Sequence, residues 1–597
     1  MTRPRTAPLA VALAAALAPG LALPQGLGLD LSEPAAPPPS EARPPKAAPA
    51  KPGPRAGAPD APPPKAVPVP PARAAAPPSR LAPLPPYAPD PRLAEARKLV
   101  DRRRYEEGAQ AAFAVARDPA GAGARLEATV VLAQALAGLG LDQVAVAELA
   151  AALADPAPGS AAGLAVQELV ALGERDHANE HGVALALAGA AAVELPPAAE
   201  GRLEVAQARW AYERGRALEE AGRGAEARQS YADALRLAGR PGMAPVAAAE
   251  ARFVEGLVRY AEDDQPAALE SFKEVVRITN PRRGEASDPR LRSLAFLQLA
   301  RIHYEHRQNR YAIFYYDRLP WGGEEWLEAL WESSYAHYRI GDYEKALGNL
   351  LTLQSSYFKD EYFPESYVLK AIIYYENCRF PEARRILEDF AKDFGPLQAE
   401  LGRLAARSGP PEALFGAFAR AEREGGAELS PRVVKAALTD RSLRRLDLAA
   451  RAADRQAGEG LARLSPGFRD SELGRKVAAA LAGVRAGLAA EGGARLRQQL
   501  EAERDGLRDL LQQALRIRIE VTRREREALE ASLTTGKRPD ALRAYRYSTA
   551  VSDEQLYWPY DGEFWRDELG TYTYTLTRGC RAPVESGGAA PEQGSGR

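Results

Sequence analysis

One spacing of small and large side chains recurs along the chain and most constrains its fold. Two segments, "YERGRALEEAGRGAEARQSYADALRLAGRP" and "EGLVRYAEDDQPAALESFKEVVRITNP", place a glycine, an alanine and an aromatic residue at the same offsets: Gly215, Ala227 and Tyr231, then Gly256, Ala268 and Phe272. Small residues allow two antiparallel helices to approach closely, and the large residue fills the gap beside them. The spacing therefore predicts helix pairs that stack along the chain.

The same three positions return in four further segments and are typical of tetratricopeptide repeats. The matching residues are Ala133, Ala145 and Leu149; Ala300, Ala312 and Tyr316; Ser334, Ala346 and Leu350; and Ala371, Ala383 and Leu387. A weaker copy, "AEARKLVDRRRYEEGAQAAFAVARDP", opens the series, an irregular alanine-rich helical stretch follows Pro156, and Pro396 is expected to end the last helix. We expect an all-α fold with a tetratricopeptide-like solenoid over residues 93–396.

The first residues have the organisation of a secretory signal peptide. Two arginines precede an apolar run from Ala7 to Leu23, with small residues suited to cleavage near Ala18 and Ala22. The alternative is a retained membrane anchor, but prolines interrupt the run and its length is marginal for a span. We expect residues 1–22 to be cleaved as a signal peptide. The alanine, arginine and glycine bias is typical of a high-GC bacterial genome, so the expected location of the mature chain is the periplasm. No later segment reaches about 18 uninterrupted apolar residues, so no integral membrane protein is expected after cleavage.

Residues 23–92 predict a disordered linker rich in proline and alanine. Between Pro34 and Pro91 there are 23 prolines in 58 residues, and this composition cannot bury enough apolar surface to offset the entropy of ordering. The segment is expected to be a spacer; the alternative is that it binds the cell wall or a proline-reading partner. Residues 581–597 predict a second disordered tail.

The region after the repeats is expected to be helical and less regular. Residues 397–490 are rich in alanine, and breaks are expected at Gly395, Pro410, Pro431, Pro466 and Gly492. Residues 491–533 predict one long coiled-coil-like helix, whose seam visits Leu496, Leu500, Glu503, Leu507, Leu510, Ala514, Ile517, Val521, Arg524 and Ala528. The seam predicts either self-association through residues 496–528 or folding back onto the repeats.

Aromatic residues are concentrated in the later repeats. Between Phe296 and Phe394 lie 22 of the 43 aromatic residues of the chain. Most can pack between helices, but runs such as "YAIFYYD" and "WGGEEWLEALW" exceed what packing needs, so a partner-binding face is expected. The candidate partner-binding residues are Tyr304, Tyr311, Tyr315, Trp326, Trp331, Tyr338, Tyr367 and Tyr375.

The stretch "YWPYDGEFWRDELGTYTYTLTRGC" ends the ordered part of the chain. "TYTYTLTR" alternates as a strand does, and a lone strand is unstable, so residues 550–580 are expected to dock on the aromatic repeats and cap the end of the solenoid. The candidate docking residues are Trp558, Tyr560, Trp565, Tyr572 and Tyr574. The alternative is a ligand for another protein by strand addition.

The chain has two cysteines, Cys378 in a turn of the last good repeat and Cys580 at the end of the aromatic stretch. In an exported chain this arrangement favours an internal disulfide. The alternatives are two unpaired buried thiols or an intermolecular bridge through Cys580.

The sequence offers little for catalysis, a cofactor or nucleic acid. "HANEH", from His177 to His181, matches the zinc signature H-x-x-E-H, but it lies in an irregular connection without a third-ligand motif. No CxxC, GxSxG or GxxxxGK motif occurs. With 79 basic and 80 acidic side chains, the chain has no net field to attract a polyanion. We expect no enzyme, no metal, no cofactor and no nucleic-acid binding; a zinc hydrolase that uses His177, Glu180 and His181 is the least favoured alternative.

Several segments resemble one family of repeat proteins. "RIHYEHRQNRYAIFYYDRLP", "WESSYAHYRIGDYEKALGNLLTL", "YVLKAIIYYENCRFPEAR" and the aromatic stretch at 557–580 resemble exported tetratricopeptide proteins of myxobacteria and relatives, a group that includes the periplasmic repeat component of the adventurous gliding-motility machinery. The resemblance covers residues 291–396 and 557–580. It implies a non-enzymatic periplasmic scaffold whose partners are envelope proteins, serving motility or another envelope task such as biogenesis or cell division.

Overall fold

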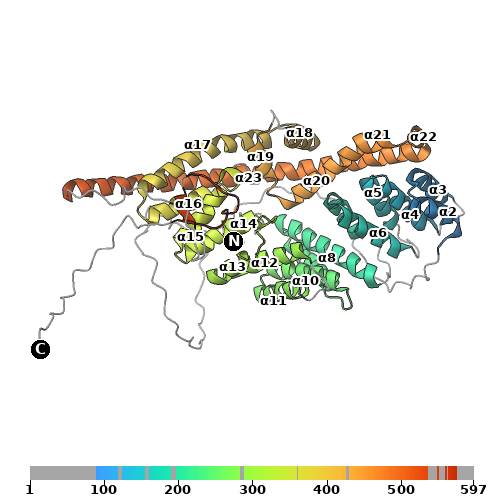
Figure 1. Cartoon of the computed structure of the whole chain (residues 1–597), viewed down its shortest axis with the longest axis horizontal. Coiled ribbons are helices and arrows are strands. Elements are labelled where there is room, and N and C mark those ends of the chain that lie inside the picture. Colours follow the sequence, from blue (N-terminus) through green and yellow to red (C-terminus); the bar gives the residue numbers. More distant parts are fainter. Residues whose placement is uncertain are drawn as a thin grey trace, which may run out of the picture. The chain divides into compact units, whose positions relative to one another are not determined.

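The computed structural model describes residues 89–118, 124–154, 161–189, 197–282, 288–358, 361–424, 429–535, 547–549, 559–560 and 562–574. The expected all-α class is confirmed, since helices make up nearly all the regular structure in these ranges (Figure 1). The predicted signal peptide, nearly all of the linker and the predicted tail lie outside them. Among the described residues no helix is both long enough and apolar enough to cross a bilayer.

Successive helices of the first part of the chain pack against each other in pairs. The short helix η2 (Pro91–Leu93) opens this part, and eight pairs follow within the described ranges. They are α2 (Ala94–Asp101) with α3 (Tyr105–Arg117), α4 (Arg125–Gly138) with α5 (Asp142–Leu153), α6 (Ala162–Arg175) with α7 (Glu180–Gly189), α8 (Pro197–Glu220) with α9 (Gly224–Ala238), α10 (Pro245–Ala261) with α11 (Gln265–Ile278), α12 (Pro289–Glu305) with α13 (Asn309–Tyr316), α14 (Trp326–Arg339) with α15 (Tyr343–Leu353), and α16 (Glu365–Glu376) with α17 (Phe380–Ala405).

Seven of these pairs share one turn between their helices. A residue with left-handed φ, between 57° and 78°, stands in each turn: Arg103, Gly140, Gly222, Asp263, Arg307, Gly341 and Cys378. The next amide donates a hydrogen bond to the carbonyl five residues earlier, as from Arg379 N to Tyr374 O at 2.8 Å. This is the Schellman helix end. Between α6 and α7 the short helix η4 (His177–Asn179) takes its place.

The small and large residues of the predicted spacing meet inside the pairs. A Cβ built on Gly256 would lie 2.7 Å from the ring of Phe272, and one on Gly215 would overlap the ring of Tyr231. Both rings are buried, and so is the alanine that precedes each of them in the pattern, Ala268 and Ala227. Because these glycines have no side chain, the aromatic rings of the second helix can pack directly against the first helix.

The C-terminal helices depart from the expected boundaries. After α18 (Pro411–Glu424), α19 (Pro431–Ala437), α20 (Arg441–Arg455), η6 (Gln456–Gly460), α21 (Leu461–Arg463) and α22 (Pro466–Arg469), one helix, α23, runs from Glu472 to Thr535. The long helix predicted at 491–533 thus begins nineteen residues earlier. Gly492 is not a break: it lies inside α23, where a Cβ would come 2.6 Å from the ring of Phe415 on α18.

Pro396 does not end the last helix of the pairs, contrary to expectation. Helix α17 continues through Gly395 and Pro396 to Ala405. The apolar stripe of Leu387, Phe390 and Phe394 continues in Leu397, Leu401 and Leu404, and all six are buried. Helix α17 packs along α23 (Figure 1). Burial of this stripe outweighs the backbone hydrogen bond that the proline cannot make.

The coiled-coil seam of α23 is buried within the chain. Leu496, Leu500, Leu507, Ala514 and Val521 are almost fully covered, and α23 packs against α16, α17, α18, α19 and α20. The seam therefore folds back onto the preceding helices. Leu510, Ile517 and Ala528 of the same seam are half-buried, and self-association through residues 496–528 stays a prediction.

A small antiparallel sheet ends the described chain. Its strands are β1 (Tyr547–Thr549), β2 (Pro559–Tyr560) and β3 (Tyr572–Tyr574), in the order β2-β1-β3. Tyr547 pairs with both Tyr560 and Tyr574. The predicted docking residue Trp558 lies outside the described residues.

Candidate protein-interaction site

The C-terminal segment lies on α14, α15 and α16. Lys345 Nζ donates to Gly570 O at 2.8 Å, and Gly570 N donates to Thr352 Oγ1 at 2.9 Å. Trp321 Nε1 donates to Leu569 O at 3.0 Å. These bonds fix the main chain of residues 569–570 on the turn before α14 and on α15. Gly570 has a φ of 86°, and a Cβ there would come 2.9 Å from the Trp326 ring, so the bend requires glycine.

The strand β3 contributes the buried side chains of this contact. Tyr572 and Tyr574 are buried, and the Tyr574 ring meets that of Tyr374 on α16 at 5.8 Å between centroids. Tyr572 joins an apolar cluster with Leu351 and Leu569, against which Trp326, Phe358 and Phe564 pack. Trp565, predicted to dock, is instead 56% exposed.

The described residues of the segment do not cap the last helix of the pairs. Its described contacts are with α14, α15 and α16, whereas α17 packs against α23. The long helix covers the apolar face of α17 that the segment was expected to cover. The sheet therefore lies on the side of the helix pairs, across α15.

Three of the eight predicted partner-binding aromatics are buried. Tyr304, Trp331 and Tyr375 are at most 8% exposed. Trp331 packs against Tyr335, and the Tyr375 hydroxyl donates to Glu520 of α23 at 3.3 Å. These three side chains stabilise the fold and cannot contact a partner, because neighbouring helices cover them.

Four others are half-buried and have partners within the chain. The Tyr315 ring stacks on His303, and Trp326 supports the C-terminal segment. The Tyr338 hydroxyl donates to Glu376. Tyr367 packs on Phe390 and Phe394. Tyr311 is exposed. The high aromatic content of these repeats is thus used mainly for packing.

Three exposed aromatic residues belong to the docked segment, contact it, or adjoin in the chain a residue that packs on it. Trp321, Tyr357 and Trp565 are 51%, 53% and 56% exposed. Trp321 lies 5.6 Å from Trp326 between ring centroids, while Tyr357 and Trp565 are the chain neighbours of Phe358 and Phe564 in the apolar cluster. We call these three residues the aromatic rim. One feature of the sequence could have indicated that Trp321 is exposed: it follows Pro320 and precedes two glycines, outside the helical pattern.

A buried ion cluster supports the helices beneath this region. Arg301 of α12 donates from Nε to both carboxylate oxygens of Glu332 at 3.0 Å, and from Nη2 to Glu328 at 2.5 Å. The Tyr316 hydroxyl also donates to Glu332, at 2.9 Å. Burial would raise the pKa of Glu328, but the Arg301 and Arg441 guanidinium groups hold that pKa down to about 2. The cluster joins α12, α13 and α14.

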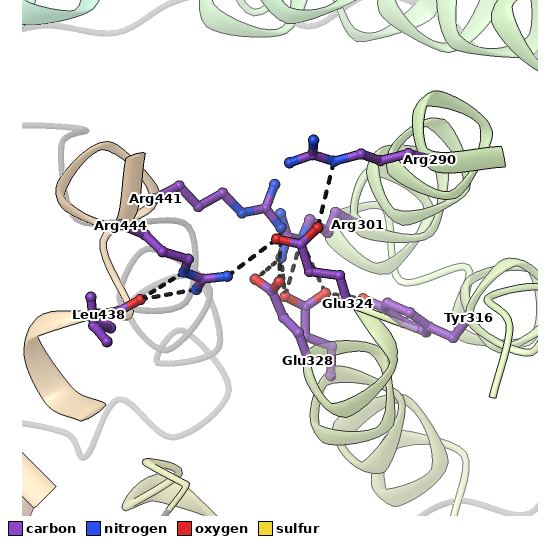
Figure 2. Close-up of polar contacts among 9 residues, drawn as sticks. Arg290, Arg301, Tyr316, Glu324, Glu328, Leu438, Arg441 and Arg444 are labelled. Atoms are coloured by element: carbon purple, nitrogen blue, oxygen red, sulfur yellow. Dashed lines mark hydrogen bonds and ion pairs between the residues drawn. The ribbon is translucent and has the colours of Figure 1, made fainter. Parts of the chain in front are cut away.

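Helix α20 faces the same carboxylates from the other side. Figure 2 shows Arg441 and Arg444 reaching toward Glu328 and Glu324, at 3.0 and 3.4 Å. Arg444 also donates to the Leu438 carbonyl at 2.9 Å. The chain's own arginines therefore pair with Glu328 of α14 and with Glu324 just before it, and both ion pairs are partly exposed.

The H-x-x-E-H motif does not assemble as a metal site. His177 Nδ1 lies 2.5 Å from Glu180, and Arg290 lies 3.2 Å from the same carboxylate. His181 instead faces Glu491 of α23 at 3.2 Å. The two imidazoles thus have different partners, and a guanidinium stands where a cation would be. The described residues contain no cluster of three or more potential metal ligands.

Cys378 occupies the left-handed turn position between α16 and α17, with a φ of 57°, and is disulfide-bonded. The chain has two cysteines. Cys580 lies outside the described residues, so its pairing with Cys378 stays a prediction.

Comparison with models of protein families finds no match. Comparison with curated proteins also finds none. The candidate site therefore rests on the geometry of the chain itself.

Proposed function

We propose that the chain is a non-enzymatic scaffold of stacked tetratricopeptide-like helix pairs that binds other proteins in a cell-envelope complex. The observation that carries this proposal is the aromatic rim, placed where a separate chain segment docks on regularly paired helices. Arrays of helix pairs offer extended surfaces for partners. Exposed tryptophan and tyrosine side chains are the residues that most often dominate binding energy in protein interfaces.

The rim is a better partner site than the three sequence-selected aromatics that are buried. Tyr304, Trp331 and Tyr375 are buried, whereas Trp321, Tyr357 and Trp565 present about half of their surface to solvent. Hydrogen bonds from the side chains of Trp321 and Lys345 and from the backbone amide of Gly570 hold the segment that carries Trp565. A partner would therefore meet a surface that is already organised, which reduces the entropy cost of binding.

The proposed location is the periplasm. The basic and apolar start of the chain favours export, and the disulfide at Cys378 favours an oxidising compartment. The resemblance to exported repeat proteins of myxobacteria makes gliding motility the first process to examine. An accessory role in envelope biogenesis or cell division is the alternative, and the neighbouring genes would distinguish the two.

Crosslinking in intact cells tests the scaffold. We expect a specific set of envelope proteins to be captured with the unaltered chain and lost with Trp321→Ala and Trp565→Ala. Trp210→Ala is the matched control, because Trp210 is also exposed but lies on α8. Equal capture by all the variants would exclude the rim as the binding site.

A zinc hydrolase remains the candidate from another class, and the geometry does not favour it. Metal analysis of the purified chain tests it directly. Stoichiometric zinc that disappears in a His177→Ala and His181→Ala double variant would overturn the non-enzymatic proposal.

A further inference from the structure

The C-terminal part of α23 carries a second apolar stripe, apart from the seam that packs on the preceding helices. Leu515, Ile519, Leu529 and Leu533 are between 47% and 83% exposed. At about 100° per residue, these four side chains lie within about 80° of one another around the helix axis, over a length of about 27 Å. A single exposed leucine is ordinary, whereas a continuous stripe on one helix marks a contact surface.

The buried seam lies on a different side of the same helix. Leu507, Ala514 and Val521 are almost fully buried. Around the helix axis they are turned from the centre of the stripe by about 80–120°. The helices that cover the seam therefore leave the stripe exposed.

The helix that presents the stripe is held in place by its own chain. The Tyr375 hydroxyl donates to Glu520 at 3.3 Å, and Arg384 Nε donates to Glu525 at 3.1 Å. Both carboxylates stand between the first and the last residue of the stripe. A short isolated helix would have to be ordered on binding, but here the helix is already formed, so association does not carry that entropy cost.

The charges beside the stripe change sign along it. Residues 515–524 contain four arginines and one glutamate, and residues 525–534 contain three glutamates and one arginine. Two copies in parallel would place like charges against each other. Two copies in antiparallel orientation place the basic half of each helix against the acidic half of the other, which is the complementary arrangement.

One antiparallel register also matches the stripe with itself about a twofold axis. The facing pairs are then Leu515 with the partner's Leu533, Ile519 with the partner's Leu529, and Thr522 with the partner's Arg526. The apolar stem of the arginine can lie over the threonine methyl group while its charge stays in water. On one flank of the stripe, Arg516 comes beside the partner's Glu530.

We propose that two copies of the chain associate through the stripe of Leu515, Ile519, Leu529 and Leu533, with their α23 helices antiparallel. The stripe is less than three heptads long, and standard interfaces bury about 1,200–2,000 Å². The dimer is therefore reversible, with a dissociation constant on the order of 10–100 µM. It uses a different face of α23 from the buried seam, and it gives each assembly two copies of any partner-binding surface.

Sedimentation of the full chain tests the association. We expect a shift from monomer to dimer between about 1 and 200 µM. Ile519→Gln with Leu529→Gln removes the central apolar contacts at exposed positions and should raise the dissociation constant at least about tenfold. Leu185→Gln is the matched control, because Leu185 is 48% exposed and lies on α7. A chain that stays monomeric up to about 200 µM, or a dimer that survives the double variant, would overturn the proposal.

Exchange of charges tests the orientation. Arg516→Glu places a like charge beside the partner's Glu530 and should raise the dissociation constant about threefold or more. Adding Glu530→Arg should restore it, because these positions meet only in the antiparallel dimer; in a parallel dimer they are about 21 Å apart along the axis. If the exchange restores nothing, the antiparallel arrangement is wrong.

Vesicles of anionic phospholipid test a different occupant of the stripe. A monomeric chain that binds these vesicles, and loses the binding with Ile519→Gln and Leu529→Gln, would assign the stripe to a lipid surface and overturn the proposal. We expect no difference in vesicle binding between the unaltered chain and this double variant. Crosslinking to envelope proteins is read separately, so a monomer here leaves the scaffold proposal standing.

Discussion

The backbone carbonyl of Tyr572 lies directly against Gly348 of α15, so that a side chain at position 348 would overlap it. Tyr572 is fully buried there. Glycine inside a helix is less favourable than alanine by about 0.5–1 kcal/mol. Position 348 requires glycine because the strand β3 crosses α15 there.

Gly348→Ala should therefore expel β3 from α15. We expect the free energy of unfolding in urea to fall by about 1–3 kcal/mol, as for other overpacked sites. Gly483→Ala is the matched control, because Gly483 also lies in a helix, α23, and has no atom within 4 Å of a built Cβ. The control should be neutral or up to about 1 kcal/mol more stable. Equal stability of the two variants would mean that β3 does not pack on Gly348.

The cysteine pair gives a second prediction. Thiol titration of the denatured protein, isolated from cells without reductant, should show no free thiol before reduction and two after it. Cys378→Ser with Cys580→Ser should lower the free energy of unfolding by up to about 5 kcal/mol, the chain-entropy value for a loop of roughly 200 residues. Two free thiols in unreduced protein would exclude the bridge, and a disulfide-linked dimer on a non-reducing gel would indicate the intermolecular alternative.

Arg301→Met should be among the most destabilising single changes. It leaves Glu332, which has no exposed surface, with Tyr316 as its remaining hydrogen-bond donor. Breaking a buried ion pair from one side typically costs about 3–5 kcal/mol, which urea denaturation would measure. Arg104→Met is the control, because its pair with Glu107 is about half exposed and should contribute at most about 1 kcal/mol. If Arg301→Met lowers the free energy of unfolding only slightly, and by the same amount in a Glu332→Gln background, then Arg301 and Glu332 do not stabilise the fold as a pair.

The helix pairs could be predicted from sequence because their signal is local and repeated. Gly215 with Tyr231, and Gly256 with Phe272, pack as their spacing requires. The turn residues carry less information, since the same left-handed position is held by glycine in three pairs and by Arg103, Asp263, Arg307 or Cys378 in the others. Spacing, more than residue type, marks the repeat.

The C-terminal half was harder to predict because its contacts join distant residues. Pro396 and Gly492 are ordinary helix breakers, and both lie inside helices here because long apolar stripes pack around them. The exposure of Trp321 and the burial of Trp331 depend on the segment that docks more than two hundred residues later and on neighbouring helices. Composition predicted an aromatic region, but it could not separate packing rings from exposed ones.

The buried seam of α23 predicts how the long helix is held. Leu507→Ala should lower the free energy of unfolding by about 2–5 kcal/mol, because the side chain is almost fully buried. Leu533→Ala on the same helix should change it by less than about 0.5 kcal/mol, since Leu533 is 83% exposed. Sedimentation should show the same oligomeric state for the unaltered chain and for the Leu507→Ala variant. A dimer that dissociates in this variant would support self-association through the seam.

Glu503 makes the docking of α23 sensitive to pH. Its carboxyl is buried beside Tyr362, Glu365, Thr439 and Gln499; burial and the charge of Glu365 raise its pKa from 4.5 to about 7. Between pH 4.5 and 7 the folded protein keeps a proton on Glu503 that the unfolded chain has released. The contribution of Glu503 to the free energy of unfolding is therefore fully present below pH 4.5 and is lost as the pH rises through 7. Glu503→Gln should flatten that slope and stabilise the chain at pH 8 by about 2–3 kcal/mol. Urea denaturation at pH 5, 6, 7 and 8 measures it, with the exposed Glu530→Gln as control; an unchanged slope would show that Glu503 is already ionised in the folded protein.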